Sequence, residues 1–248
     1  MEIAHANGLS TGLVSTSSIT HATPASFVAH NPARGNYEDI AKDFLNGTID
    51  VFIGGGENNF RKRKDGVDLT SKLSEQGYEV TYSIDDLKKT TSGKVVGLLS
   101  KEHMEKSTEG RMGKLAIMTE KAIQTLSKNK KGFVLMVEGS QIDFAGKDLD
   151  WMVSEVIDFE AAVSKAYDFA NLSNETLVIV TADHETAGLT LQNGSIKDHK
   201  VTGNFFSGSH TGVMVPIFSM GPGAERFSGI HENTFFFNEF IDLLRLKK

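Results

Sequence analysis

The stretch Phe133–Lys147, FVLMVEGSQIDFAGK, contains the pattern that decides the fold. Its first five residues, 133–137, are all apolar, which predicts a buried strand of a parallel sheet. The apolar run ends at Glu138, and Asp143 lies at the start of the next segment. Open α/β sheets bind ligands beyond the carboxyl ends of their strands. Two carboxylates at this place therefore predict a binding cleft at that edge of the sheet.

A second apolar run repeats this arrangement further along the chain. Leu177–Val180 leads directly into the sequence TADHE at 181–185. Asp183 and His184 offer a carboxylate oxygen and an imidazole, which are donor types of catalytic zinc sites. A single Asp-His pair after a strand is more often a turn cap beside a packed or solvated histidine. Two strands that deliver such groups to one edge favour a metal-binding cleft.

The remaining apolar patterns alternate between strands and helices. The long segment 150–172 is predicted to be a helix with Val156, Val163 and Tyr167 on one apolar stripe, and Gln192-Asn193-Gly194 is predicted to be a hairpin turn. Other strands are expected at 9–16, 49–53, 78–82, 95–99 and 213–220, and other helices at 37–46, 69–76, 113–128 and 233–246. This order predicts one α/β domain over residues 1–248, with a short insertion at about 185–209. Its expected architecture is a three-layer αβα sandwich around a mostly parallel sheet.

Composition limits the classes of function. A hydrophobic content of 39% and a charged content of 23% are ordinary for a soluble globular protein. The net charge of −6 and the lack of a basic stripe argue against a nucleic-acid partner. No apolar run approaches the roughly 20 residues of a membrane span, and the first residues do not resemble a signal peptide. Because the chain has no cysteine, a metal would be bound by Asp, Glu, His or hydroxyl groups.

Four further side chains have an ordinary interpretation and a functional one. His210 lies in the sequence GSHTG and taken alone is a loop histidine. Thr23 precedes Pro24 and is expected to be the N-cap of a helix with proline at its first position. Arg34 is a loop arginine whose planar fork could bind two phosphate oxygens. Glu138 follows a fully apolar strand, where an unpaired buried charge is costly, so a metal or another cation is expected beside it.

Taken together and in order, these segments resemble the alkaline phosphatase family. The resemblance covers essentially the whole chain and rests on HATPASFVAH at 21–30 with Arg34, VEGSQID at 137–143, TADHET at 181–186, GSHTG at 208–212, VPIFSMGPG at 215–223 and ENT at 232–234. It implies hydrolysis of small phosphate monoesters through a phosphoserine intermediate, with two Zn²⁺ ions and one Mg²⁺ ion.

The resemblance also implies roles for the candidate zinc ligands. Asp183 and His184 resemble the ligands of the zinc ion that activates the serine. Asp143 and His210 resemble ligands of the other zinc ion, which stabilises the leaving oxygen and binds the attacking water. Two metals of this kind bind the attacking and leaving oxygens of an in-line displacement.

The other candidate residues match the magnesium and phosphate sites of the family. Thr23 and Glu138 match magnesium ligands, in keeping with the preference of that ion for oxygen. Arg34 matches the phosphate clamp, and His21 stands near the magnesium and the phosphate. The family is usually exported, so the resemblance implies a periplasmic or secreted protein, and it also implies that a homodimer can form.

The sequence departs from the family pattern in two places. The nucleophilic serine of the family follows an aspartate, and no Asp-Ser pair occurs in the 248 residues. In the family, that serine and an aspartate bridging zinc and magnesium lie upstream of the segment that begins this chain, so an N-terminally incomplete fragment is expected. The family also has a histidine four residues after the position of Asp143, where this chain has Lys147. A protonated ammonium repels Zn²⁺, and Asp148 or Asp150 would have to replace it.

Two functions follow from these departures. The first is a phosphomonoesterase of the alkaline phosphatase type that is inactive alone because the serine segment is missing. The alternative is a non-catalytic remnant of the same fold that binds metal or phosphate, which Lys147 and the missing serine favour. A sulfatase is excluded within this chain because its nucleophile derives from cysteine.

Overall fold

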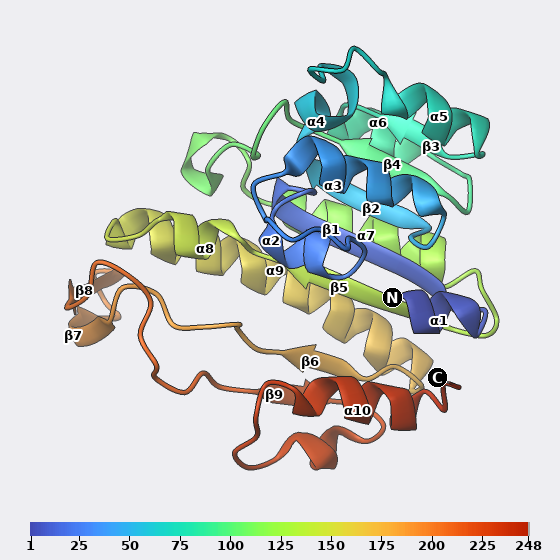
Figure 1. Cartoon of the computed structure of the whole chain (residues 1–248). Coiled ribbons are helices and arrows are strands. Elements are labelled where there is room, and N and C mark those ends of the chain that lie inside the picture. The colour runs from blue at the N-terminus through green and yellow to red at the C-terminus, as the bar shows by residue number, and fades with distance from the viewer. Residues whose placement is uncertain (248) are drawn as a thin grey trace.

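Five parallel strands form the central sheet of the protein (Figure 1). The computed structural model describes residues 1–247. In sheet order the strands are β3 (Glu79–Thr81), β4 (Val95–Leu98), β2 (Val51–Gly55), β1 (Ser10–Ser18) and β5 (Phe133–Glu138). Every neighbouring pair runs parallel, so the carboxyl ends of all five strands lie at one edge.

Helices cover both faces of this sheet. One face packs against α2 (Ala22–Ser26), α3 (Tyr37–Asp43), α4 (Glu57–Arg61) and α5 (Leu69–Glu75). The other face packs against α6 (Ile84–Lys89), α7 (Lys114–Leu126) and α9 (Leu149–Ser173). The shorter elements are α1 (Glu2–Ala6), α8 (Gln141–Phe144) and the 3₁₀ turns at Phe44–Asn46, Ser107–Glu109 and Ala224–Phe227. This arrangement confirms the predicted three-layer α/β fold.

Alternation along the strands produces the two cores. Leu13 and Phe52 face α2–α5, whereas Val14 and Ile53 face α6, α7 and α9, because successive side chains of a strand point to opposite faces. All four are fully buried. A Cβ atom on Gly12 would lie 2.6 Å from a side-chain methyl of α7, so glycine at this position lets the helix approach the sheet.

Strand β5 confirms the predicted element but not its predicted burial. All six residues of β5 are half-buried. One edge of β5 pairs with β1, and within residues 1–247 no strand pairs with the other edge. The prediction of full burial was wrong because an uninterrupted apolar run does not reveal whether a strand has one neighbour or two.

The C-terminal third forms separate small elements. Strands β6 (Val178–Val180) and β9 (Phe218–Met220) make an antiparallel pair beside α9, followed in sequence by α10 (Phe235–Leu243). The strand predicted at 213–220 is therefore right only for its last three residues. Strands β7 (Leu189–Ser195) and β8 (Lys200–Phe205) form an arm that stands away from the sheet (Figure 1). The hairpin was predicted correctly, but its turn is at 196–199, since 193–195 continue β7.

A buried ion cluster joins α9 to the loop that follows β4. Arg111 forms ion pairs with Glu155 and Asp158 of α9, and all three side chains are about 99% buried or more. Arg111 Nε also donates to the carbonyl of Glu105 at 2.7 Å. Gln141, just beyond β5, donates at 2.6 Å to the carbonyl of Met104, the residue before Glu105. The cluster therefore fixes the loop against which the end of β5 packs. No helix within residues 1–247 is long and apolar enough to cross a membrane.

Candidate metal centre

Acidic and imidazole side chains meet beyond the carboxyl ends of β5 and β6, which lie at the same end of the molecule (Figure 1). Asp143 lies on α8 directly after β5, His184 follows β6, and His210 lies in the loop between β8 and β9. One potential ligand atom from each lies within 4.8 Å of the other two. His210 Nε2 is 3.1 Å from Asp143 Oδ1, and the two imidazole rings stack with centroids 3.5 Å apart. The fold thus assembles three donors from distant segments.

Asp183 lies beside this group. Its Oδ2 atom is 3.3 Å from His184 Nε2, while His184 Nδ1 is 3.0 Å from the carbonyl oxygen of Glu185. With Nδ1 placed to donate to this carbonyl, Nε2 is the ring nitrogen on the side of Asp183 and is the one that a metal would share with that carboxylate. Asp183 Oδ1 also accepts from the backbone N–H of His184 at 3.1 Å, as expected for an aspartate that caps a turn.

Glu138 is half-buried at the same edge, with its carboxylate turned toward the buried Ser15. The Ser15 hydroxyl donates to Glu138 Oε2 at 2.6 Å. Burial raises the pKa of Glu138, the hydroxyls of Ser15 and Thr23 oppose this rise, and the negative charges of Asp183 and Asp143 add to it. A cation at this place would relieve the repulsion among the three carboxylates. The set of one carboxylate and several hydroxyls fits a hard cation such as Mg²⁺.

Thr23 is not the helix cap that the sequence predicts. The residue at the N-cap of α2 is His21, and the helix begins at Ala22. Thr23 lies in the first turn, and its hydroxyl is hydrogen-bonded to Glu138. The prediction was wrong because the helix starts before the Thr-Pro pair.

His21 and Arg34 lie together at the rim of the centre. Arg34 Nη2 is 3.3 Å from His21 Nε2, and since a guanidinium can only donate, Nε2 must accept. Burial, together with the charges of His103 and Arg34 and against the opposing charge of Asp143, lowers the pKa of His21 to about 4. His21 Nδ1 is buried without a hydrogen-bond partner within residues 1–247. The exposed Arg34 has no carboxylate partner in the described part of the chain, so its fork can bind an anion.

Several contacting residues were missed by sequence reasoning. The rings of His103, His21 and Phe144 contact one another with centroids 4.9 to 5.3 Å apart, and His103 Nδ1 accepts from the backbone N–H of Ser18. His103 lies in an irregular loop and carries no local signal. Thr186 donates to Asp143 Oδ1 at 3.0 Å. Thr186 could have been found, because it follows the predicted ligand pair within TADHET.

Lys147 does not belong to the donor group of Asp143, His184 and His210. Lys147 is exposed in the turn after α8. Of its two predicted substitutes, Asp148 caps α9 by accepting from the backbone N–H of Trp151 at 3.0 Å, and Asp150 is exposed in the first turn of that helix. The predicted substitution therefore finds no support in the positions of these two residues.

The donor set has the chemistry of a zinc site. A carboxylate oxygen and two imidazole nitrogens are ligands that catalytic zinc uses with a fourth position left open. The structure groups Asp143 and His210, expected at one zinc ion, with His184, expected at the other. Glu138 and Thr23 lie beside them as a separate oxygen-rich cradle.

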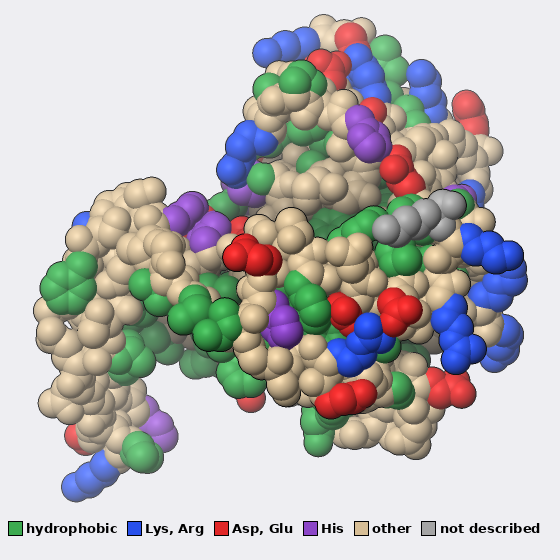
Figure 2. Space-filling view, turned by 60° about the horizontal axis from the view of Figure 1, so that its bottom comes forward, with side chains coloured by type: hydrophobic (Ala, Val, Ile, Leu, Met, Phe, Trp, Pro, Cys, Tyr) green, Lys and Arg blue, Asp and Glu red, His purple; other side chains and the backbone are tan. Residues whose placement is uncertain are grey.

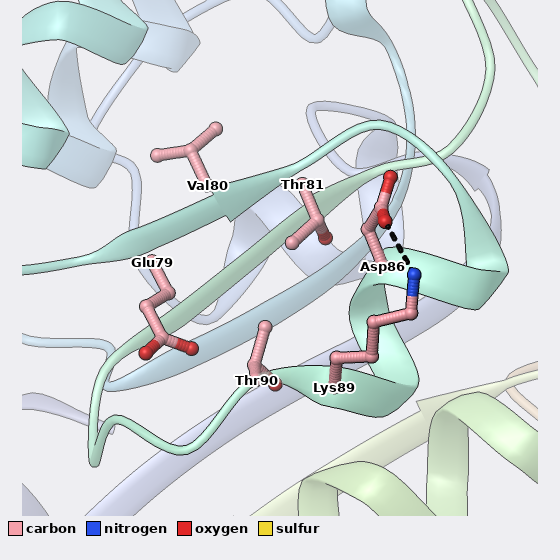
Figure 3. Close-up of a pocket in the computed structure, with 6 residues that line it drawn as sticks. All are labelled: Glu79, Val80, Thr81, Asp86, Lys89 and Thr90. Carbon is pink, nitrogen blue, oxygen red and sulfur yellow. Dashed lines mark hydrogen bonds and ion pairs between the residues drawn. The ribbon is translucent and has the colours of Figure 1, made fainter.

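A separate hollow lies elsewhere in the described part of the chain (Figure 3). It measures about 360 Å³ and is lined by residues of β3 and α6, at the sheet edge opposite β5. Its charged members include Asp86 and Lys89, which form an ion pair at 3.2 Å, and it contains no histidine. This hollow offers no group of ligands and no unpaired cation for a phosphate, so it is not the functional site.

Known proteins give an independent view of the chain. The family model described as alkaline phosphatase matches residues 1–205. Alkaline phosphatase 4 of Bacillus subtilis is 34% identical over an alignment that covers 100% of this chain and 70% of the relative. Alkaline phosphatase 3 of the same organism is 44% identical over 201 residues, which cover 77% of this chain and 43% of the relative. The alkaline phosphatase of Escherichia coli is 31% identical, with 100% and 67% covered.

Solved structures agree with these relatives. The structure of alkaline phosphatase from the Antarctic bacterium TAB5 superposes with a TM-score of 0.91 at 39% identity, covering 100% of this chain and 75% of that one. The chain spans between 43% and 70% of the length of the curated relatives named above. A family match over most of its residues, with relatives above 30% identity along its whole length, shows that the chain belongs to the alkaline phosphatase family of phosphomonoesterases.

Proposed function

We propose that the chain provides the metal-binding and phosphate-binding part of a centre that hydrolyses small phosphate monoesters through a phosphoserine intermediate. The observation that carries this proposal is the group of Asp143, His184 and His210 at the strand ends. Arg34 has no carboxylate partner within residues 1–247 and lies against His21. The pKa of His21 is lowered mainly by burial, the charge of Arg34 adds to this shift, and the charge of Asp143 opposes it. Metal ligands and an anion-binding guanidinium are the two requirements of metal-assisted phosphoryl transfer.

Each side chain then has a defined task. Asp143, Asp183, His184 and His210 would hold zinc, which when bound lowers the pKa of hydroxyl groups and neutralises developing charge. Glu138 and Thr23, which lie beside that set, would hold Mg²⁺. Arg34 binds two phosphate oxygens, and the neutral ring of His21 accepts one N–H of Arg34 and so orients the fork.

The nucleophile is not among the hydroxyls next to Glu138. Ser15 and Ser17 are fully buried, Ser140 is 7% exposed, and their hydroxyls bond to one another or to the carboxylate. A nucleophile must face the substrate and a base instead. We therefore propose that this chain alone does not complete the reaction. The alternative, a non-catalytic remnant that binds metal or phosphate, is favoured by the exposed Lys147 at a position where the resemblance implies a histidine.

The finer properties of the family are also proposals for this chain. Zinc at the histidine sites and magnesium at Glu138 and Thr23 are proposed from the donor chemistry, and a variant of the TAB5 enzyme has been solved with Mg bound. A periplasmic or secreted location and a homodimer are proposed from family membership alone.

The test combines binding with turnover. The purified chain is loaded with Zn²⁺ and Mg²⁺, and we expect inorganic phosphate to bind in equilibrium dialysis. Arg34→Ala should weaken phosphate binding at least about tenfold, since a bidentate charge-assisted contact is lost, whereas Arg245→Ala near the C-terminus should not. Phosphate binding that needs neither metal nor Arg34 would contradict the proposed site.

The same preparation is then assayed with an aryl phosphate. We expect no turnover above that of the metals alone. Robust turnover would support a phosphatase but overturn the claim that the chain lacks its nucleophile.

A further inference from the structure

One carboxylate connects the two loops that carry the histidines. Glu185 Oε1 accepts from the backbone N–H of Gly188 and, at 3.2 Å, from that of Leu189. Glu185 Oε2 accepts from the backbone N–H of Thr211 at 3.1 Å and from the Thr211 hydroxyl. Four donors from two segments thus converge on a single side chain that the proposed reaction does not use.

These segments hold the candidate ligands. Glu185 directly follows His184, and Thr211 directly follows His210. Residues 206–217 contain no helix or strand, and the side chain of His210 is 48% exposed. The loop is also held at its ends, where the Ser207 N–H donates to the Ala187 carbonyl at 3.0 Å and the Pro216 carbonyl accepts from Thr181 at 3.0 Å. Thr211 is the hydrogen-bonded residue next to His210, whose ring stacks on that of His184 with centroids 3.5 Å apart.

The chemistry requires a carboxylate rather than an amide. An ionised carboxylate accepts at both oxygens, whereas the amide of glutamine turns an NH₂ group toward one of the two sets of donors, whichever way it is oriented. All four groups that face Glu185 are N–H or O–H donors, so both of its oxygens must act as acceptors. The next residue, Thr186, donates to Asp143 at 3.0 Å, so residues 185–186 are bonded both to Asp143 and to Thr211, the neighbour of His210.

We propose that Glu185 is a positioning residue that fastens the His210 loop to the His184 loop and so arranges the zinc ligands before the metal binds. The part of this inference that concerns zinc rests on the proposed function. The fastening itself is a property of the metal-free protein and can be tested without zinc.

The metal-free test measures hydrogen exchange of individual backbone amides. In the wild-type protein we expect the Thr211 and Gly188 amides to be protected. In Glu185→Gln at least one of the two, the one that faces the NH₂ group, should exchange at least about tenfold faster, while the amides of β1 stay unchanged and show that the variant is folded. Glu160→Gln, an exposed glutamate on α9, is the matched control and should leave both amides protected. Exchange of both the Thr211 and the Gly188 amides that is equal in the wild type and Glu185→Gln would overturn the proposal.

The zinc test measures affinity by competition with a chromophoric chelator. Removal of an outer hydrogen-bonding partner of a metal ligand typically weakens metal affinity about 10- to 100-fold, and we expect a loss in this range for Glu185→Gln but not for Glu160→Gln. Thr211→Val removes only the hydroxyl donor and should give a smaller loss of zinc affinity. Thr211→Ser keeps the hydroxyl and should bind zinc as the wild type does. If Glu185→Gln binds zinc as tightly as Glu160→Gln, the positioning role is overturned.

The two tests separate the two claims. If the wild type binds no zinc but its Thr211 or Gly188 amide is protected only while Glu185 is present, the proposed function fails and the fastening stands. If zinc binds and Glu185→Gln changes neither exchange nor affinity, the proposed function survives and the inference about Glu185 fails.

Discussion

Residues 1–170 and residues 171–247 differ in how fully their apolar side chains are buried. All fully or nearly fully buried apolar side chains of the described chain lie in the first part, apart from Ala187 and Phe227. The second part instead carries many exposed large apolar side chains, namely Leu172, Leu191, Ile196, Phe206, Val213, Met214, Phe218, Ile230, Phe237, Phe240 and Leu244. Figure 2 shows hydrophobic side chains on the surface and the β7–β8 arm standing away from the body.

The boundary between the two parts explains this difference. The outer edge of β5 and the outer edge of β6 both lack a paired strand within residues 1–247. The stripe predicted for α9 is only partly covered, since Val156 is 47% and Tyr167 is 51% exposed. A groove of about 140 Å³ runs between α9 and the β6–β9 pair. The stability of the fold therefore resides in the parallel sheet, whereas the candidate centre draws ligands from both parts.

The largest expected contrast between the two parts is in hydrogen exchange. Amides of β1 and β2 are buried in the sheet and should exchange only through global unfolding, which costs about 5–15 kcal/mol in domains of this kind. Amides of β7 and β8 belong to an exposed two-stranded arm and should open locally. We expect protection factors at least about a thousandfold higher in β1 and β2, measured in the metal-free protein. Similar protection in the two strand pairs would show that both parts unfold as one unit.

The same substitution should have different effects in the two parts. Phe52 is fully buried between β2 and its helices, so Phe52→Ala should lower the free energy of unfolding by about 3–5 kcal/mol. Phe218 is 65% exposed, and Phe218→Ala should cost less than about 1 kcal/mol. Urea denaturation of both variants measures the difference. A loss at Phe218 as large as that at Phe52 would mean that Phe218 is covered in solution.

The accuracy of the sequence-based predictions also differs between residues 1–170 and residues 171–247. Strands β2, β4 and β5 were predictable because each is built on an apolar run, and Glu138, Asp183 and His184 were predictable because they come just after such runs. The partial exposure of β5 could not be predicted, because it depends on which strands lie beside β5 in space. The strand predicted at 213–220 was mostly wrong because its apolar residues have no partner to pair with.

The candidate centre shows a similar limit. His210 was identified only through the resemblance of GSHTG to a family motif, because nothing local to it indicates a ligand. Its position depends on Glu185 and Thr211, which contact each other across 26 residues of chain. The contacts of His103 likewise arise because its loop approaches the end of β2 closely. A Cβ atom on Gly55 of β2 would lie 2.0 Å from the carbonyl oxygen of Glu102 in that loop. Motifs locate the ligands, but tertiary contacts arrange them.

A buried charge sharpens the comparison within the first part. Arg111→Met leaves Glu155 and Asp158 buried without their cation, so the free energy of unfolding should fall by about 3 kcal/mol, the lower end for breaking a buried ion pair. Lys165→Met on α9 breaks an exposed pair with Glu120 of α7 and should cost about 0–1 kcal/mol. Chemical denaturation of both variants provides the measurement. Equal effects would mean that water reaches the Arg111 cluster.

The smallest predicted effect is a pH dependence that reports on the first part alone. All four tyrosines, Tyr37, Tyr78, Tyr82 and Tyr167, lie before residue 171. Tyr78 donates to the carbonyl of Ile49 at 2.8 Å, and burial, followed by the charge of Asp50, raises the pKa of Tyr78 to about 12. In the unfolded chain the phenol ionises near pH 10, so between about pH 10 and 12 only the unfolded state releases this proton.

The sign of the effect follows from this difference in bound protons. The contribution of Tyr78 to stability is fully present below about pH 10 and is lost as the pH rises toward 12, because ionisation then favours the unfolded state. Tyr78→Phe should lower stability by about 1 kcal/mol at pH 8 through loss of the hydrogen bond. Above pH 10 its stability should decline less steeply than that of the wild type, as measured by urea unfolding at pH 8, 10 and 11. Parallel declines in the two proteins would mean that Tyr78 ionises as easily in the folded state as in the unfolded chain, which would contradict its burial in the sheet.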